Sequence, residues 1–87
     1  MNRKERKVYE DLVIESLRKR KKDLTELIND AYVGWRVFNS RKSLNNPSRS
    51  IKLIRYEMST EIIPSMCRKE AITMEEGFYG LNDKVSL

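Results

Sequence analysis

Apolar side chains recur three and four positions apart along most of this 87-residue chain, and no other feature restricts the fold more. A helix with 3.6 residues per turn brings such positions onto one face, whereas a half-buried strand needs strict alternation. The stripes comprise Tyr9, Leu12, Val13 and Leu17; then Leu24, Leu27, Ile28, Ala31, Trp35 and Phe38; then Ile51, Ile54, Met58 and Ile62. The sequence therefore predicts an all-α fold.

Caps and helix-breaking residues predict where the helices begin and end. Residues 3–39 are expected to be helical, either as one long helix weakened at 21–23 or as a helical hairpin. The second helix would begin after Asp23, which has Glu26 three positions on, as in a capping box. Within it, residues 32–38 include Gly34 and also have strand-like composition.

The second half of the chain contains the stronger breaks. Asn46-Pro47 predicts a loop over 40–47, because the residue before proline avoids helical geometry. Helical structure is expected over 48–76, ended or kinked at Pro64 and stopped at Gly77, with an irregular tail over 77–87. We expect residues 1–87 to form one small domain with little room for a deep catalytic cleft.

Positive charge is concentrated in separate segments. The net charge is +5, made of +5 over residues 1–22, −3 over 23–35, +6 over 36–55 and −3 over 56–87. Residues 18–22 are consecutive cations, of which Arg18 and Lys22 would share a helix face and could contact a partner. A solvated, charged hinge is the alternative interpretation of this run.

The basic stretch over residues 36–55 is the stronger candidate for charge contacts. Its candidate residues are Arg41, Lys42, Arg49, Lys52 and Arg55. A helix-turn-helix would need a shorter connection with a turn glycine, and the chain contains no aromatic RNA-binding signature. We therefore expect a larger protein with an acidic surface as the partner, with nucleic acid as the alternative.

Aromatic residues offer two further candidates for partner binding. Trp35 lies on an apolar stripe, so we expect it to pack on Ile51, Ile54 and Met58, with an interface anchor as the alternative. Phe78 and Tyr79 lie between glycines in an acidic segment, which is typical of a docking peptide or a clasp.

The residue types present argue against catalysis. The chain has no His and one Cys, and it contains no recognisable catalytic, cofactor or metal-binding motif. No secretion signal or membrane span is evident, so we expect a cytoplasmic protein without a membrane partner. The heptad Leu17, Leu24, Ala31 and Phe38 leaves a coiled-coil homodimer open.

Together these features predict a small non-enzymatic regulatory protein that binds and modulates a larger protein, such as nucleic-acid-handling machinery. A small basic DNA- or RNA-binding protein is the first alternative. A structural subunit of a larger assembly is the second.

Overall fold

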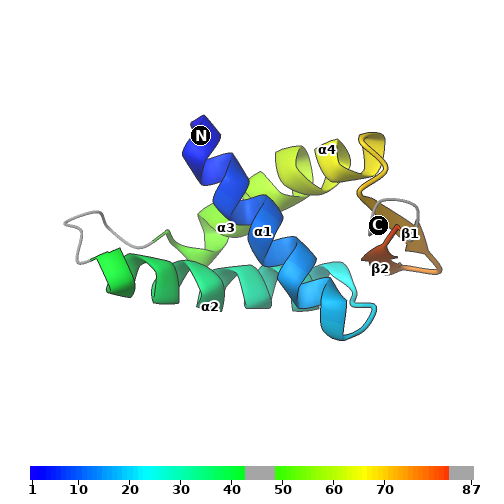
Figure 1. The fold of residues 1–87 in the computed structure, drawn as a ribbon, viewed down its shortest axis with the longest axis horizontal. Coiled ribbons are helices and arrows are strands. Elements are labelled where there is room, and N and C mark those ends of the chain that lie inside the picture. The colour runs from blue at the N-terminus through cyan, green and yellow to red at the C-terminus, as the bar shows by residue number, and fades with distance from the viewer. Residues whose placement is uncertain (43–48, 83–87) are drawn as a thin grey trace.

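The computed structural model describes residues 1–42 and 49–82, without the side chains of residues 39–42 (Figure 1). Its elements are α1 (Arg3–Lys19), α2 (Leu24–Lys42), α3 (Ile51–Glu57), the π-helical η1 (Met58–Ile62), α4 (Ile63–Arg68), β1 (Ile72–Glu75) and β2 (Phe78–Leu81). The fold is predominantly helical and carries a small antiparallel sheet, so the all-α prediction holds only for its helical part. None of the helices in the described residues is long and apolar enough to cross a membrane.

The first two helices form a hairpin. Asn2 and Glu5 make a capping box at the start of α1. Asp23 and Glu26 make the same exchange before α2, where the Glu26 N–H donates to Asp23 Oδ1 at 2.8 Å. The chain is therefore helical on both sides of residues 20–23 but not through them, and α2 continues to Lys42, past the predicted end at residue 39. The strand alternative for residues 32–38 is wrong.

The helical segment from Ile51 to Arg68 accommodates Pro64 through a π-helical turn, η1, in which the hydrogen bonds span five residues instead of four. A proline inside a helix has no N–H to donate, and its ring crowds the carbonyl four residues earlier. Here the Ile63 N–H bonds the carbonyl of Met58, five residues back, and the helical path continues to Arg68. This region begins at Ile51 rather than at residue 48, with Ser50 as its N-cap.

The prediction for residues 69–82 was wrong. In place of a helix to residue 76 and an irregular tail, β1 and β2 pair antiparallel, with Ile72 opposite Leu81 and Glu75 opposite Phe78. The turn between the strands has positive φ at both Glu76 (54°) and Gly77 (83°). Positive φ at both residues of a two-residue loop is typical of a tight β-hairpin. Gly77 is therefore part of a turn between strands and does not terminate a helix.

The core lies between α1, α2 and the α3–α4 region. Trp35 is 4% exposed and belongs to the same buried cluster as Ile54 and Met58, with Ile51 packed against that cluster. Its ring meets those of Tyr9 and Phe38 edge to face, at 5.2 and 5.5 Å between centroids. Leu17 and Ala31 of the heptad are buried in this cluster, so their stripe faces inward and is not exposed for a coiled coil.

Candidate functional site

Arg49 lies at the centre of a buried ionic cluster. Its side chain is 13% exposed, and it pairs with Glu5 of α1 and with Glu57 of α3, at 3.1 Å for the latter. The Tyr9 hydroxyl donates to the same Glu57 oxygen at 2.7 Å. The guanidinium carbon lies 4.8 Å from the centroid of the Trp35 ring, which is cation–π range. These contacts neutralise Arg49 within the fold.

Burial and this network also act on Tyr9. Burial disfavours the phenolate, and the adjacent Glu57 carboxylate disfavours it further, so the pKa of Tyr9 is raised well above its ordinary value. Tyr9 therefore stays protonated and acts as a hydrogen-bond donor to Glu57.

The cationic run 18–22 is also largely compensated. Arg18 pairs with Glu15 at 3.3 Å, Arg20 with Glu26, and Lys21 with Glu75 at 3.9 Å. Lys22 is buried, pairs with Asp30, and donates to the Ser16 hydroxyl at 3.1 Å. The Lys22 backbone also exchanges two hydrogen bonds with Tyr79, at 3.0 and 2.7 Å, which ties the hairpin to the helices.

The Asp30 carboxyl responds to this environment. Its burial favours the neutral form, but hydrogen bonds from Lys22 and Ser16 outweigh that effect and hold the pKa of Asp30 below its ordinary value. Lys22 is therefore a structural cation and is not displayed to a partner.

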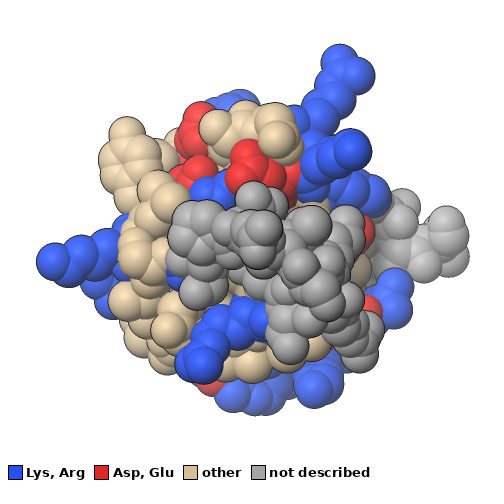
Figure 2. Space-filling model, turned by 90° about the vertical axis from the view of Figure 1, so that its left-hand side faces the viewer, with Lys and Arg blue, Asp and Glu red and all other residues tan. Residues whose placement is uncertain are grey.

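The first two turns of α1 carry four cations, three of which form no ion pair with another described residue. Arg3, Lys4 and Arg6 have no carboxylate partner within residues 1–42 and 49–82, while Lys7 pairs with the exposed Asp11 at 3.2 Å. Figure 2 looks at the end of the molecule on the left of Figure 1, where Lys and Arg side chains project on several sides. Acidic atoms are confined to smaller areas of that view.

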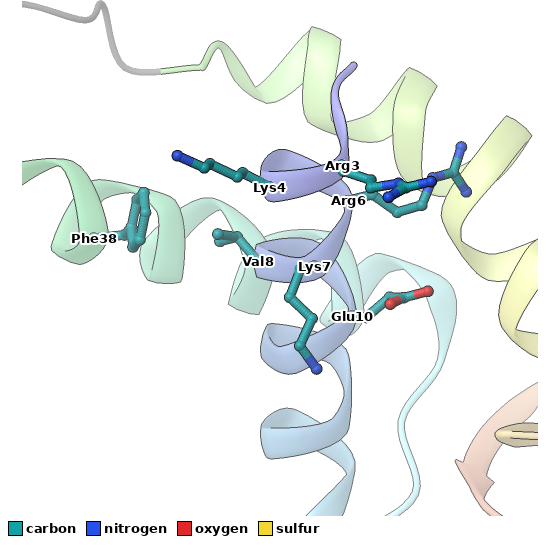
Figure 3. Close-up of a pocket in the computed structure, with 7 residues that line it drawn as sticks. All are labelled: Arg3, Lys4, Arg6, Lys7, Val8, Glu10 and Phe38. Atoms are coloured by element: carbon teal, nitrogen blue, oxygen red, sulfur yellow. The ribbon is translucent and has the colours of Figure 1, made fainter.

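These cations lie near two apolar side chains, Val8 of the same helix and Phe38 of α2. Arg3, Lys4, Arg6, Lys7, Val8, Glu10 and Phe38 line an open pocket of ≈ 490 Å³, hereafter the basic pocket (Figure 3). Lys4 and Val8 extend on the side of α1 that faces Phe38 of α2. Glu10, its one acid, pairs with Lys69 at 3.2 Å. The pocket thus has an apolar floor of Val8 and Phe38 with Lys4 beside it, while Arg3 and Arg6 extend on the opposite side of α1.

The position of these cations works against helix stability. The N-terminus of a helix carries partial positive charge, so acidic side chains stabilise its first turn and basic ones destabilise it. Glu5 is the one acid in the first turn of α1, beside Arg3, Lys4 and Arg6. A departure from local preference without a compensating contact in the described fold is typical of a functional surface.

The structure separates the residues that the sequence singled out. Lys52 and Arg55 are exposed on α3, and no ion pair joins them to another described residue. Arg41 and Lys42 belong to the last turn of α2, but their side chains lie outside the described part. Phe78 is 46% exposed, Tyr79 is half-buried, and Trp35 is a core residue.

Sequence reasoning missed the basic pocket. The sequence does contain an indication of it: Arg3, Lys4 and Arg6 lie in the first turn of a capped helix, where acidic residues are favoured. The contribution of Phe38 had no local signal, because that residue reaches the pocket from another helix.

Nothing in the described residues forms a metal site, since no group of three His, Cys, Asp or Glu side chains is placed to hold one. Burial raises the pKa of the Cys67 thiol, which disfavours the reactive thiolate. No protein-family model, curated protein or solved structure matches this chain.

Proposed function

We propose that this is a small non-enzymatic binding protein that docks on an acidic surface of a larger protein and thereby modulates it. The observation that supports the proposal is the basic pocket. There Arg3, Lys4 and Arg6 lack partners among the described residues and lie at the end of α1 where cations are least favourable.

The apolar floor favours a protein partner over a nucleic acid. Protein interfaces combine apolar contacts with polar ones, and Val8 and Phe38 beside Lys4, with Arg3 and Arg6 across α1, offer both. Single-stranded nucleic acids are bound by cations beside aromatic rings on which bases stack, so Phe38 would suit them too, whereas the aliphatic Val8 offers no ring for stacking. An acidic segment that carries an apolar side chain is therefore the partner chemistry we expect.

Lys52 and Arg55, exposed on α3, would add charge contacts to the partner outside the basic pocket. Exposed charges of this kind mainly raise the association rate and select the partner, and their effect falls with salt. We leave Lys22 and Arg49 out of the binding surface, because their charges are compensated within the chain.

The test is affinity capture from nuclease-treated extracts of the cells that express the protein. The wild type is compared with Arg3→Glu/Lys4→Glu and with the control Lys19→Glu/Arg68→Glu, which changes the net charge equally at exposed sites away from the pocket. We expect the wild type and the control to retain the same protein partners, and the pocket variant to lose them.

Direct binding to labelled duplex and single-stranded oligonucleotides at two salt concentrations completes the test. Tight binding with a steep salt dependence, no nuclease-resistant partner, and loss of oligonucleotide binding in the pocket variant would replace the proposal with the nucleic-acid function. Equal capture by all three proteins would remove the basic pocket from the function altogether.

A further inference from the structure

The tip of the β-hairpin displays the chemistry that the basic pocket is suited to bind. Glu75 and Glu76 are exposed at the end of β1 and in the turn, and Phe78, 46% exposed, begins β2. Lys21 lies 3.9 Å from Glu75, but both side chains are largely exposed, so water screens this pair and Glu75 remains accessible to a stronger partner. An exposed aromatic ring beside two carboxylates thus projects from a short, tight turn.

We propose that the hairpin tip of one copy docks into the basic pocket of a second copy. The Phe78 ring would pack on the apolar floor formed by Val8 and Phe38, while Glu75 and Glu76 meet Lys4 beside that floor. Each surface thus has an apolar group beside a charge, and the two charges have opposite sign, which favours the contact and helps to fix its register.

A copy cannot occupy its own pocket in this fold. The molecule extends 38 Å along its longest axis, and the hairpin turn lies at the right-hand end of Figure 1. The first turns of α1 lie in the opposite half of that view. Tip and pocket are different surfaces, so each added copy presents a new free tip or a new free pocket, and association proceeds head to tail.

The contact is small, which sets its expected strength. A few side chains on each partner bury less area than a standard stable interface, so association should be weak and concentration-dependent. This inference uses the same basic pocket as the proposed function, and a self-associated form would compete with the larger partner for it.

Sedimentation velocity over a wide range of protein concentration tests the proposal. The variants are Arg3→Glu/Lys4→Glu in the pocket, Glu75→Lys/Glu76→Lys in the tip, and Phe78→Ala, each checked by circular dichroism for the native helical signal. We expect the wild type to sediment faster as concentration rises, and each variant alone to associate at least about tenfold more weakly. The control Lys19→Glu/Arg68→Glu should behave as the wild type.

Mixing provides the decisive observation. An equimolar mixture of the pocket and tip variants should regain association, because each supplies the wild-type surface that the other lacks. A monomeric wild type at all concentrations, a pocket variant that still self-associates, or a mixture that does not recover would each overturn the proposal. A monomeric wild type, with partner capture still lost in the pocket variant, would overturn self-association and leave the proposed function standing.

Discussion

Arg49 places a positive charge where little water reaches it, and the fold depends on how that charge is matched. Two carboxylates and an indole face surround its guanidinium, and they come from three different helical segments. Removing one member of a buried ion cluster leaves the remaining charges without compensation, and that penalty exceeds the gain from the original pair.

Arg49→Ala should therefore lower the free energy of unfolding by about 3–5 kcal/mol. Urea unfolding monitored by circular dichroism measures the change. Arg68→Ala is the matched control, because that arginine is exposed and should alter stability by no more than about 0.5 kcal/mol. A loss below about 1 kcal/mol for Arg49→Ala would show that the cluster is not buried as described.

Tyr9 predicts a specific loss of stability in alkaline solution. Burial and the neighbouring Glu57 raise its pKa in the folded state, while the unfolded chain ionises near the ordinary tyrosine value of about 10. The contribution of Tyr9 to the free energy of unfolding is therefore complete below about pH 10. It is lost as the pH rises further, because the unfolded state then releases the tyrosine proton while the folded state retains it.

Unfolding curves measured between neutral pH and about pH 11 should show this decline in the wild type and a shallower one in Tyr9→Phe. The comparison isolates Tyr9 from the lysines, which titrate in both proteins. Parallel pH profiles would mean that Tyr9 ionises equally well in the folded state.

At the scale of elements, α1 and α2 approach closely because Gly34 has no side chain. A Cβ at this position would overlap with the Leu12 side chain of α1. Replacing glycine by alanine in a helix normally stabilises it by about 1 kcal/mol, but overpacking of a helix contact costs about 1–3 kcal/mol.

We expect the overlap to dominate, so Gly34→Ala should be destabilising by about 1 kcal/mol net. A double-mutant cycle with Leu12→Ala, measured by urea unfolding, separates the two effects. In the Leu12→Ala background the same glycine substitution should become neutral or stabilising. Stabilisation by Gly34→Ala in the wild-type background would contradict the close approach.

At the scale of the whole molecule, binding and stability should respond in opposite directions to charge. Arg3→Glu/Lys4→Glu puts acids in the first turn of α1, where the helix dipole favours them. Lys19→Glu/Arg68→Glu puts acids in the last turns of α1 and α4, where it disfavours them.

The pocket variant should therefore melt no lower than the wild type while losing its partner, whereas the control should melt lower and keep its partner. Thermal unfolding beside affinity capture measures both properties. A pocket variant that melts well below the wild type would mean that Arg3 and Lys4 support the fold and are not reserved for a ligand.

The amino-acid sequence by itself determined the helical stripes up to Ile62 and the core residues that they contribute. Tyr9, Leu27 and Ile54 are buried because a spacing of three and four residues places them on one face of any helix that forms. The Asp23–Glu26 cap is equally local, since both partners lie within one turn. Such features need only the residues next to them.

Only the tertiary structure decided the hairpin and which cations remain exposed to a partner. The short strands of residues 72–81 depend on burial of Ile72 and on the Lys22–Tyr79 bridge, and neither is visible in a four-residue pattern. Arg49 meets Glu5 across 44 positions of sequence, while Arg3 and Lys4 have no partner in the described fold. Local spacing can predict pairs such as Lys7 with Asp11, but the neutralisation of Arg49 and Lys22 follows from contacts that only the folded chain forms.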